Sequence, residues 1–308
     1  MKRKTVTSLA IIASCFPAAC TGYGQSGGGA IGSLGIRSSE SHVHVADVFR
    51  NRTNRLLRGR LLLCGGGLIP PTVLGTFFRS GGGDQGNLVI IPTASPRSDL
   101  GDFSRHLALW NQYTWKSVSV VHVAHRDAAS DATVLDPIRN ASAVWLAGGD
   151  QRRLVERFQN TLALSELLNL LDRGGIVGGT SAGAAIASKV MIAGGITRPT
   201  LQEGWGILPD LIIDQHFSQR GRFERLARAV QQNRDQVGLG IDESTGILFE
   251  PQGVQVLGAG AVYAYLPDGH QTTKAQSISV EPNAGSGGVP RLKLTRFASG
   301  SRVESNSK

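Results

Sequence analysis

The amino-acid sequence predicts an α/β fold built on a mostly parallel sheet that helices cover on both faces. Between residues 60 and 233, short apolar runs alternate with helical patterns, as strands alternate with crossover helices in a parallel sheet. Glycine accounts for 40 of the 308 residues, about twice its average share. Several glycine clusters directly follow apolar runs, which is typical of tight turns at strand ends, and the absence of a G-X-Y period excludes collagen.

The same patterns predict the individual elements. Buried strands are expected at Arg60–Cys64, Leu88–Ile91, Val118–Val123, Ala143–Ala147 and Ile176–Val177. Helices are expected at Leu100–Tyr113, Gln151–Asn160, Leu164–Leu171, Ala182–Lys189 and Arg220–Asn233. Beyond Gly238, short strands at Leu239–Ile241, Ile247–Phe249, Val254–Leu257 and Val262–Leu266 predict an antiparallel extension of the same sheet. An edge strand is expected at Arg291–Phe297.

Composition along the chain predicts one compact domain at residues 56–281 with segments of other kinds on either side. Residues 1–19 are typical of an export signal, because three basic residues precede an apolar stretch too short to span a membrane. Small residues before Cys20 are typical of a lipoprotein signal with Cys20 as the lipidated residue, and ordinary signal-peptidase cleavage is the alternative. Residues 20–55 predict a Gly/Ser-rich tether and residues 282–308 a flexible tail. The expected location is therefore the periplasm, the cell envelope or the medium, with a lipid anchor as the membrane contact.

Charge and cysteine content narrow the function classes. The formal net charge is +9, but no basic run carries interleaved aromatic residues, so nucleic-acid binding is not expected. The three cysteines show no CxxC and no Cys/His spacing typical of a metal site. Cys64, which follows an apolar run, is expected to be an unpaired buried thiol.

The strongest local motif is G-x-S-x-G at Gly179, Ser181 and Gly183. An apolar run precedes it and an Ala-rich helical stretch follows, which is the strand-to-helix context of a nucleophile elbow. The helix N-terminus behind Ser181 would favour developing negative charge. The alternative is an ordinary serine N-cap after a glycine-rich turn. Ser181 is therefore the candidate nucleophile.

A serine nucleophile needs a base and a residue that orients the base. Of the seven histidines, His216 follows the apolar run Leu211–Ile213 within a polar cluster, and the end of a buried strand is where α/β active sites form. Another apolar strand ends in Asp242 and Glu243. Alternation along a strand places these two carboxylates on opposite sides, so one of them can face His216, and the pattern does not say which.

A further strand end supplies the candidate oxyanion hole. The segment Gly148–Gln151 follows the strand expected at Ala143–Ala147, and the backbone N–H of Gly149 can point toward a developing oxyanion. The N–H of Ala182, directly after the nucleophile, would be the second donor. The alternative is a plain strand-to-helix turn with Asp150 as the N-cap.

Taken together, these segments resemble the serine peptidase family that contains cyanophycinase and the aspartyl dipeptidases. The resemblance covers about Arg60 to Leu266 and rests on Leu63–Gly67, Ile91–Ser95, Gly148–Gln151, Gly179–Ala184, Asp214–Phe217 and Gly240–Glu243. It implies a flavodoxin-like three-layer fold of the class I glutamine amidotransferase type. It also implies the triad Ser181, His216 and Glu243, and thus a serine peptidase that needs no metal and no cofactor.

The residues after His216 resemble the cyanophycinase branch of that family. There the resemblance implies substrate contacts from Gln151, Asp214, Gln215, Arg220, Arg222 and Arg225. Cyanophycin is a polyaspartate chain with arginine on each β-carboxyl, and arginine side chains bind carboxylates bidentately. The alternative is a solvated basic helix face.

The implied reaction releases β-Asp-Arg dipeptides from cyanophycin. A peptidase or isopeptidase acting on other aspartyl peptides, and a surface binding protein without activity, are the alternatives. The segment Gly67–Pro70 is apolar where many cyanophycinases have an acidic residue, so the sequence identifies no pocket for the guanidinium of the substrate. Oligomeric state, including a homodimer, stays open.

Overall fold

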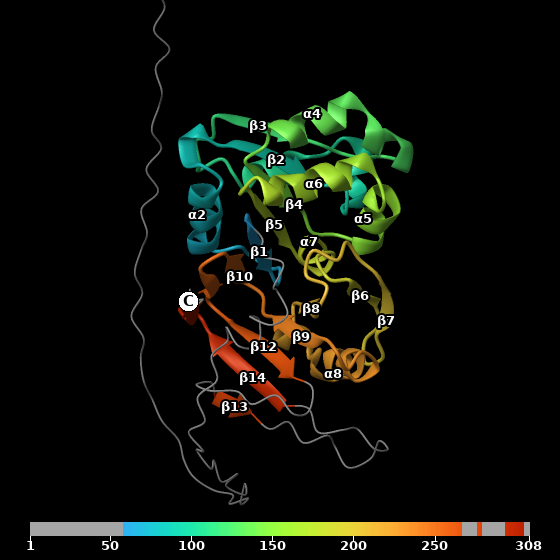
Figure 1. Cartoon of the computed structure of the whole chain (residues 1–308), viewed down its shortest axis with the longest axis vertical. Helices are drawn as coiled ribbons and strands as arrows, with labels where there is room; N and C mark the ends of the chain where they lie inside the picture. Colours follow the sequence, from blue (N-terminus) through green and yellow to red (C-terminus); the bar gives the residue numbers. More distant parts are fainter. Residues whose placement is uncertain (1–57, 267–275, 279–292, 305–308) are drawn as a thin grey trace, which may run out of the picture. The chain divides into compact units, whose positions relative to one another are not determined.

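The computed structural model of the chain describes residues 58–266, 276–278 and 293–304 (Figure 1). The expected signal segment at 1–19, Cys20 and the expected tether at 20–55 lie outside the described residues. So do parts of the expected tail, including Arg291 and Leu292 at the start of the expected edge strand.

An eight-stranded sheet is the central element of the described fold, in the order β15-β11-β10-β1-β5-β4-β2-β3. Its parallel part consists of β1 (Arg60–Cys64), β5 (Ile176–Thr180), β4 (Ala143–Leu146), β2 (Asn87–Ile91) and β3 (Ser117–Val120). Beyond β1, three antiparallel strands extend it, namely β10 (Thr245–Glu250), β11 (Gly253–Gly258) and β15 (Arg302–Glu304).

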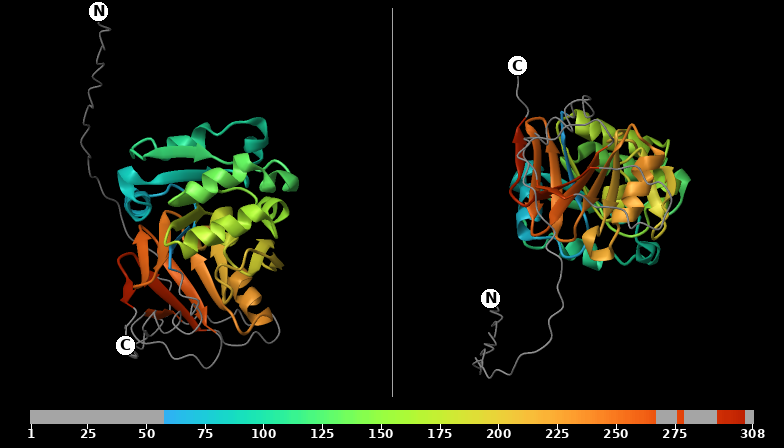
Figure 2. Two further views of the ribbon diagram at one scale, coloured as in Figure 1. Left: turned by 45° about the horizontal axis from the view of Figure 1, so that its top comes forward. Right: turned by 90° about the horizontal axis from the view of Figure 1, so that it is seen from below.

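Helices cover both faces of this sheet because its strands are apolar on both sides. In β1, Leu62 and Cys64 face a core formed with α2 (Pro71–Ser80), Trp110 and Trp115. The neighbouring Leu61 and Leu63 face the opposite core, formed with α4 (Ala132–Asn140), α5 (Gln151–Phe158) and α6 (Leu162–Asp172). Figure 2 shows these green and yellow-green helices packed together. The predicted α/β class with a mostly parallel sheet in a three-layer arrangement is confirmed.

A second, five-stranded sheet carries the rest of the chain, in the order β13-β14-β12-β9-β8. Its strands are β8 (Leu211–Gln215), β9 (Val237–Ile241), β12 (Ala261–Leu266), β13 (Gln276–Ile278) and β14 (Lys293–Ala298), and β8 and β9 run parallel. The amphipathic helix α8 (Phe223–Gln232) packs its apolar side against this sheet, next to the hairpin β6 (Val190–Gly194) and β7 (Thr200–Glu203).

The second sheet corrects the expectation that all strands after Gly238 extend one sheet. Of the four short strands expected there, only β10 and β11 do so, whereas β9 and β12 pair with each other in the second sheet. The chain crosses between the sheets at residues 242–244, where Ser244 has a positive φ of 55°. The expected edge strand is also not at an edge, because β14 pairs with β12 on one side and with β13 on the other.

Several helices differ from the expectation as well. The helix expected at Leu100–Tyr113 is broken into the 3₁₀ helix η2 (Pro96–Leu100) and the short α3 (Ser104–Ala108), because Gly101 adopts a left-handed φ of 72° between them. The helix expected at Ala182–Lys189 ends early, as α7 (Ala182–Ala185). Both α2 and α4 were not predicted. The remaining 3₁₀ helices are η1 (Gly83–Gln85), η3 (Arg126–Ser130) and η4 (Ser218–Arg220).

The state of Cys64 and the character of the helices complete the description of the fold. Cys64 is a free thiol at 2% exposure, as expected, and burial raises its pKa. Within the described ranges, none of the helices combines the length and the apolar character that a membrane span requires.

Candidate active site

The candidate site lies where the carboxyl ends of parallel strands from both sheets meet. Ser181 directly follows β5 of the first sheet, and His216 directly follows β8 of the second. Glu243 lies two residues after β9, the parallel neighbour of β8. Loops beyond β1 and β4 surround these three residues, which is the general position of ligand sites in α/β sheets.

Ser181 occupies a strained turn between strand and helix. Its φ is 52° and its ψ is −108°, and α7 begins at the next residue. Its backbone N–H donates a 2.9 Å hydrogen bond to the carbonyl of Cys64, which ties the turn to the end of β1. A Cβ on Gly179 would lie 2.3 Å from the carbonyl oxygen of Gly183, so the turn requires the small residues of the motif. This is the backbone geometry of a nucleophile elbow.

The imidazole of His216 connects the serine to a carboxylate. Its Nε2 lies 2.9 Å from Oγ of Ser181, and its Nδ1 lies 2.5 Å from Oε1 of Glu243. His216 also has a positive φ, 49°, and its backbone N–H donates a 2.7 Å hydrogen bond to the carbonyl of Gly65. The glycine loop after β1 therefore holds the histidine backbone in an unusual conformation that directs the ring to Ser181.

The structure shows which of the two adjacent carboxylates, Asp242 or Glu243, faces His216, a choice that the sequence pattern left open. The carboxylate of Glu243 reaches His216, whereas that of Asp242 is buried and accepts hydrogen bonds from the backbone N–H groups of Ser218 and Ala261. Asp242 thus joins the loop after His216 to the start of β12. The two side chains point to opposite sides, as the strand alternation requires.

The electrostatic surroundings favour the neutral form of His216. Burial lowers the pKa of His216, and the nearby guanidinium groups of Arg220 and Arg222 lower it further. The hydrogen bond to Glu243 opposes both effects. The pKa stays below the ordinary value of 6.5, so the ring is neutral at pH 7 and can accept a proton from Ser181.

Two backbone N–H groups near Ser181 are available for an oxyanion. In the described part of the chain, neither the N–H of Gly149 nor that of Ala182 donates to a protein acceptor. Gly149 has a φ of 151° and lies against the carbonyl of Ala94, where a Cβ would come within 2.1 Å of the oxygen. That carbonyl also accepts a 2.9 Å hydrogen bond from the N–H of Asp150, so the loop after β2 fixes the loop after β4.

A network of charged side chains is hydrogen-bonded to the loop after β2. The guanidinium of Arg153 donates a 3.0 Å hydrogen bond to the carbonyl of Thr93 and a 2.5 Å bond to Asp99. Asp99 also accepts hydrogen bonds from Arg157 at 2.9 Å and pairs with His122 at 3.0 Å. The bonds from Arg157 and Arg153 hold the pKa of Asp99 well below its usual range.

The expected substrate-binding arginines fall into two groups. Arg220 lines a cavity of about 520 Å³ that also contains Ser181 and His216. Arg225 instead donates to the fully buried carboxylate of Asp214, at 2.9 Å through Nε and also through Nη2. Arg222 donates to Asp214 at 3.3 Å and to the carbonyl of Gln215 at 2.6 Å. Arg222 and Arg225 are therefore occupied inside the protein and do not line this cavity.

The expected contacts from the other polar residues are also engaged internally. Asp214 is the acceptor of the two arginines just described, and Gln215 is buried with its Oε1 accepting a 3.2 Å hydrogen bond from Arg222. Gln151 donates a 2.8 Å hydrogen bond to the carbonyl of Ile192. These three residues brace the segment before His216 and the start of α5 rather than pointing freely into the cavity.

The cavity contains two residues that the sequence interpretation passed over. Arg105 and His106, from α3, line it together with Ser181. The only available signal was a pair of polar residues in a stretch expected to be an ordinary helix. Their position depends on the break at Gly101, which the helical pattern did not indicate.

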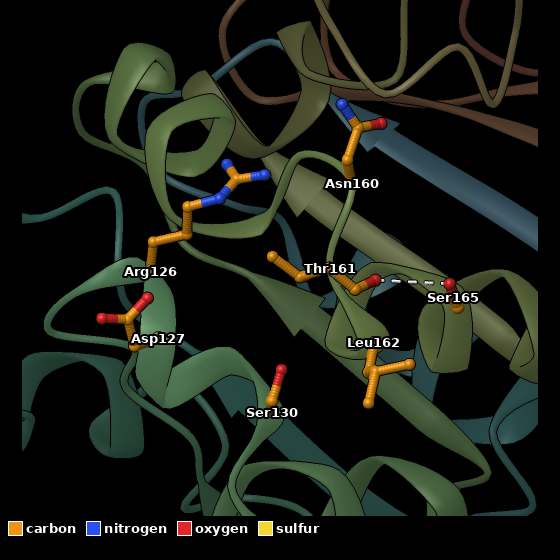
Figure 3. A pocket seen from close by; sticks show the side chains of 7 residues that line it. All are labelled: Arg126, Asp127, Ser130, Asn160, Thr161, Leu162 and Ser165. Carbon is orange, nitrogen blue, oxygen red and sulfur yellow. Dashed lines mark hydrogen bonds between the residues drawn. The ribbon is translucent and has the colours of Figure 1, made fainter.

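A second cavity, of about 500 Å³, lies elsewhere on the described fold (Figure 3). Arg126, Asp127 and Ser130 from η3 face the residues at the start of α6, where Ser165 bonds to the carbonyl of Thr161. Its lining residues include no histidine or cysteine and no nucleophile with a bonded base. The Ser181 cavity is therefore the candidate active site. In the part of the chain that the structure describes, no group of three or more His, Cys, Asp or Glu side chains is arranged to hold a metal ion.

Comparison with known proteins finds a matching family and similar curated proteins. A model of the peptidase family S51 matches residues 61–257, which contain Ser181, His216 and Glu243. The cyanophycinase of Trichormus variabilis is 36% identical over an alignment of 200 residues, and the match covers 62% of this chain and 66% of that protein. The cyanophycinase of Geminocystis herdmanii is 32% identical over 219 residues, covering 67% of this chain and 80% of that protein. The chain thus matches slightly less than two thirds of the length of the first of these relatives.

A solved structure supports the fold. The peptidase from an acI-B1 Actinobacterium superposes with a TM-score of 0.60 and covers 82% of this chain and 99% of that chain. The sequence identity is 19%, so this similarity concerns the fold alone.

Proposed function

The chain belongs to peptidase family S51, and on that premise we propose that it is a serine peptidase that hydrolyses cyanophycin. The observation that carries the proposal is the continuous chain of contacts from Ser181 through His216 to Glu243, at 2.9 Å and 2.5 Å. A nucleophile on an elbow, a neutral base and a carboxylate that orients the base are the three parts of such a triad.

The first half of the reaction forms an acyl-enzyme. Oγ of Ser181 attacks the carbonyl carbon of the scissile peptide bond, and Nε2 of His216 takes the proton of the hydroxyl. The carboxylate of Glu243 stabilises the resulting imidazolium. The negative oxygen of the tetrahedral intermediate is held by the N–H groups of Gly149 and Ala182. The C–N bond then breaks, and His216 gives the proton to the leaving amine.

The second half regenerates the enzyme. A water molecule takes the place of the amine, His216 removes one of its protons, and the hydroxide attacks the acyl carbon. The C–O bond to Ser181 breaks, and the serine oxygen regains the proton from His216. The carboxylic acid product leaves. All these proton transfers pass through the imidazole of His216. Its lowered pKa keeps the ring neutral before each step, so that it can accept a proton.

The substrate assignment rests on the relatives and on one arginine. Both relatives named above are cyanophycinases. Arg220 lies at the cavity and is not ion-paired within the described ranges, so its guanidinium is available to a carboxylate of the polymer. The free α-carboxylates of the arginine branches are such groups. We expect cleavage of the aspartate backbone to yield β-Asp-Arg dipeptides.

Incubation with insoluble cyanophycin and a panel of α- and β-aspartyl dipeptides tests this function. The proposal predicts soluble β-Asp-Arg, identified by mass, and no release by the Ser181→Ala variant. Cleavage of other aspartyl peptides without release from the polymer would replace cyanophycin by those peptides as the substrate. No cleavage of any of them would contradict the peptidase activity.

Export is proposed on the sequence of residues 1–20. Three basic residues, an apolar stretch and small residues before Cys20 support cleavage and transfer out of the cytoplasm. The mass of the N-terminal peptide from cells that express the full chain tests this. A diacylglyceryl-modified Cys20 would support a lipoprotein, an unmodified N-terminus near that position would support ordinary secretion, and an intact Met1 would contradict export.

A further inference from the structure

The titratable residues that line the active-site cavity are all arginines or histidines. Two arginines and two histidines line it, Arg105, Arg220, His106 and His216, and its lining contains no Asp or Glu. A cavity with two guanidinium groups and no carboxylate favours an anionic group of the substrate. The two arginines also come from different parts of the fold, α3 beside the first sheet and η4 after β8 of the second.

Arg105 is held in place by neutral partners. Its Nη2 donates a 3.0 Å hydrogen bond to Oγ of Ser95, which is fully buried, and its Nε lies 3.3 Å from Nε2 of His106. Burial lowers the pKa of His106, and the charge of Arg105 lowers it further. A neutral His106 can therefore accept the hydrogen bond from Nε. Neither partner neutralises the guanidinium.

The free part of this guanidinium distinguishes Arg105 from Arg222 and Arg225. In the described ranges, Nη1 of Arg105 has no hydrogen-bond partner, and no carboxylate lies within 4.0 Å of the guanidinium. Arg222 and Arg225, in contrast, are bound to Asp214. An anchored arginine at a cavity with no carboxylate bonded to it has donors available for a ligand.

We propose that Arg105 is a substrate-binding residue that holds a carboxylate of the substrate. It does so from α3, whereas Arg220 reaches the cavity from η4. Ser95 and His106 are the positioning residues that orient its guanidinium. The proposal rests on the proposed function for the reaction at Ser181, and it adds the chemical class of group that the cavity selects. The carboxylate is either the α-carboxylate of an arginine branch or the C-terminal carboxylate of the aspartate backbone.

Binding and turnover of short β-Asp-Arg oligomers with defined ends test the proposal. Three substrates are compared, with all carboxylates free, with the arginine carboxylates amidated, or with the backbone C-terminus amidated. For Arg105→Ala we expect KM for the free substrate to rise about 10- to 100-fold with a smaller change in kcat, since a hydrogen bond to a charged group is removed. The same variant should lose much less on the substrate whose relevant carboxylate is amidated, and this identifies the carboxylate. Arg105→Lys should recover part of the affinity.

The matched control is Arg97→Ala. Arg97 lies in the neighbouring η2, is exposed and pairs with Asp102 at 3.9 Å, and it does not line the cavity. Its KM values should equal those of the wild type. Equal losses by Arg105→Ala on all three substrates, or no loss on any, would overturn the carboxylate contact.

A binding measurement separates this proposal from the proposed function. In the Ser181→Ala background, calorimetry with β-Asp-Arg and with its amide measures affinity without turnover. One outcome is that Arg105→Ala weakens binding although the wild type cleaves none of the oligomers. This outcome would support the carboxylate contact and contradict the peptidase function. Cleavage by the wild type, with binding unchanged by Arg105→Ala, would support the peptidase function and contradict the carboxylate contact. An absence of both binding and cleavage would overturn both proposals.

Discussion

Gly66 lies directly against the imidazole of His216. A Cβ placed on Gly66 would come within 2.2 Å of Cε1 and 2.5 Å of Nε2 of His216. The φ of Gly66 is 107°, and the carbonyl of this residue accepts a hydrogen bond from the N–H of Ser244 at 2.9 Å. The glycine loop after β1 is thus packed between the base and the turn that carries Glu243, and it has no room for a side chain.

Gly66→Ala should therefore displace His216 and reduce kcat by at least about 100-fold, because displacements of about 1 Å in an active site cost roughly that much. Gly300→Ala is the matched control, since Gly300 has a φ of 84° and no atom within 4 Å of a built Cβ. Both variants carry backbone strain of about 1–2 kcal/mol. Steady-state kinetics and urea unfolding distinguish the two effects, and equal kcat values for the two variants would refute the packing argument.

The pH dependence of the reaction should report the charge of Arg220. Burial lowers the pKa of His216 and Arg220 lowers it further, so removal of this guanidinium should raise that pKa toward 6.5. The reaction requires neutral His216, and the acid limb of kcat/KM for an uncharged ester should consequently move to higher pH in Arg220→Ala. Arg126→Ala, at the other cavity, should leave the limb in place. An acid limb that is unchanged in Arg220→Ala would show that this arginine does not influence the base.

The buried ion cluster before His216 should matter for stability. Asp214 has no exposed surface and Arg225 is 5% exposed, so Arg225→Ala removes the bidentate partner of a buried carboxylate and leaves the 3.3 Å contact with Arg222 as its remaining ion pair. Because Arg222 still pairs with this carboxylate, the expected loss in the free energy of unfolding lies at the lower end of the range for breaking a buried ion pair, about 3 kcal/mol. Arg228→Ala, three residues along α8, removes a pair with the exposed Glu224 and should cost about 0.5 kcal/mol or less. Urea denaturation measures both, and comparable losses would contradict the buried pairing.

The nucleophile region was predictable because its determinants are local. The spacing of Gly179, Ser181 and Gly183 and the adjacent apolar run describe one strand-turn-helix unit, which β5 and α7 form. His216 was found from its place after an apolar strand. The choice between Asp242 and Glu243 was not accessible to the strand pattern, because alternation states only that the two side chains diverge. It depends on the crossing of the chain between the two sheets at residues 242–244.

The substrate side was less predictable because it depends on tertiary packing. Arg222 and Arg225 are three residues apart at the start of α8 and so share a helix face, but only the burial of Asp214 shows that this face is turned inward. Arg105 reaches the cavity because Gly101 ends η2 with a left-handed conformation and α3 restarts the chain in a new direction. A helical pattern across this segment obscures such a break.

The most direct test of the account is covalent labelling of Ser181 by an uncharged fluorophosphonate. Intact mass should show one adduct, peptide mapping should place it on Ser181, and peptidase activity should fall in proportion to labelling. Ser181→Ala should fold, remain unlabelled and release no product, and His216→Ala should label far more slowly because the hydroxyl lacks its base. An adduct on another residue, or product release that is undiminished in Ser181→Ala, would contradict Ser181 as the nucleophile.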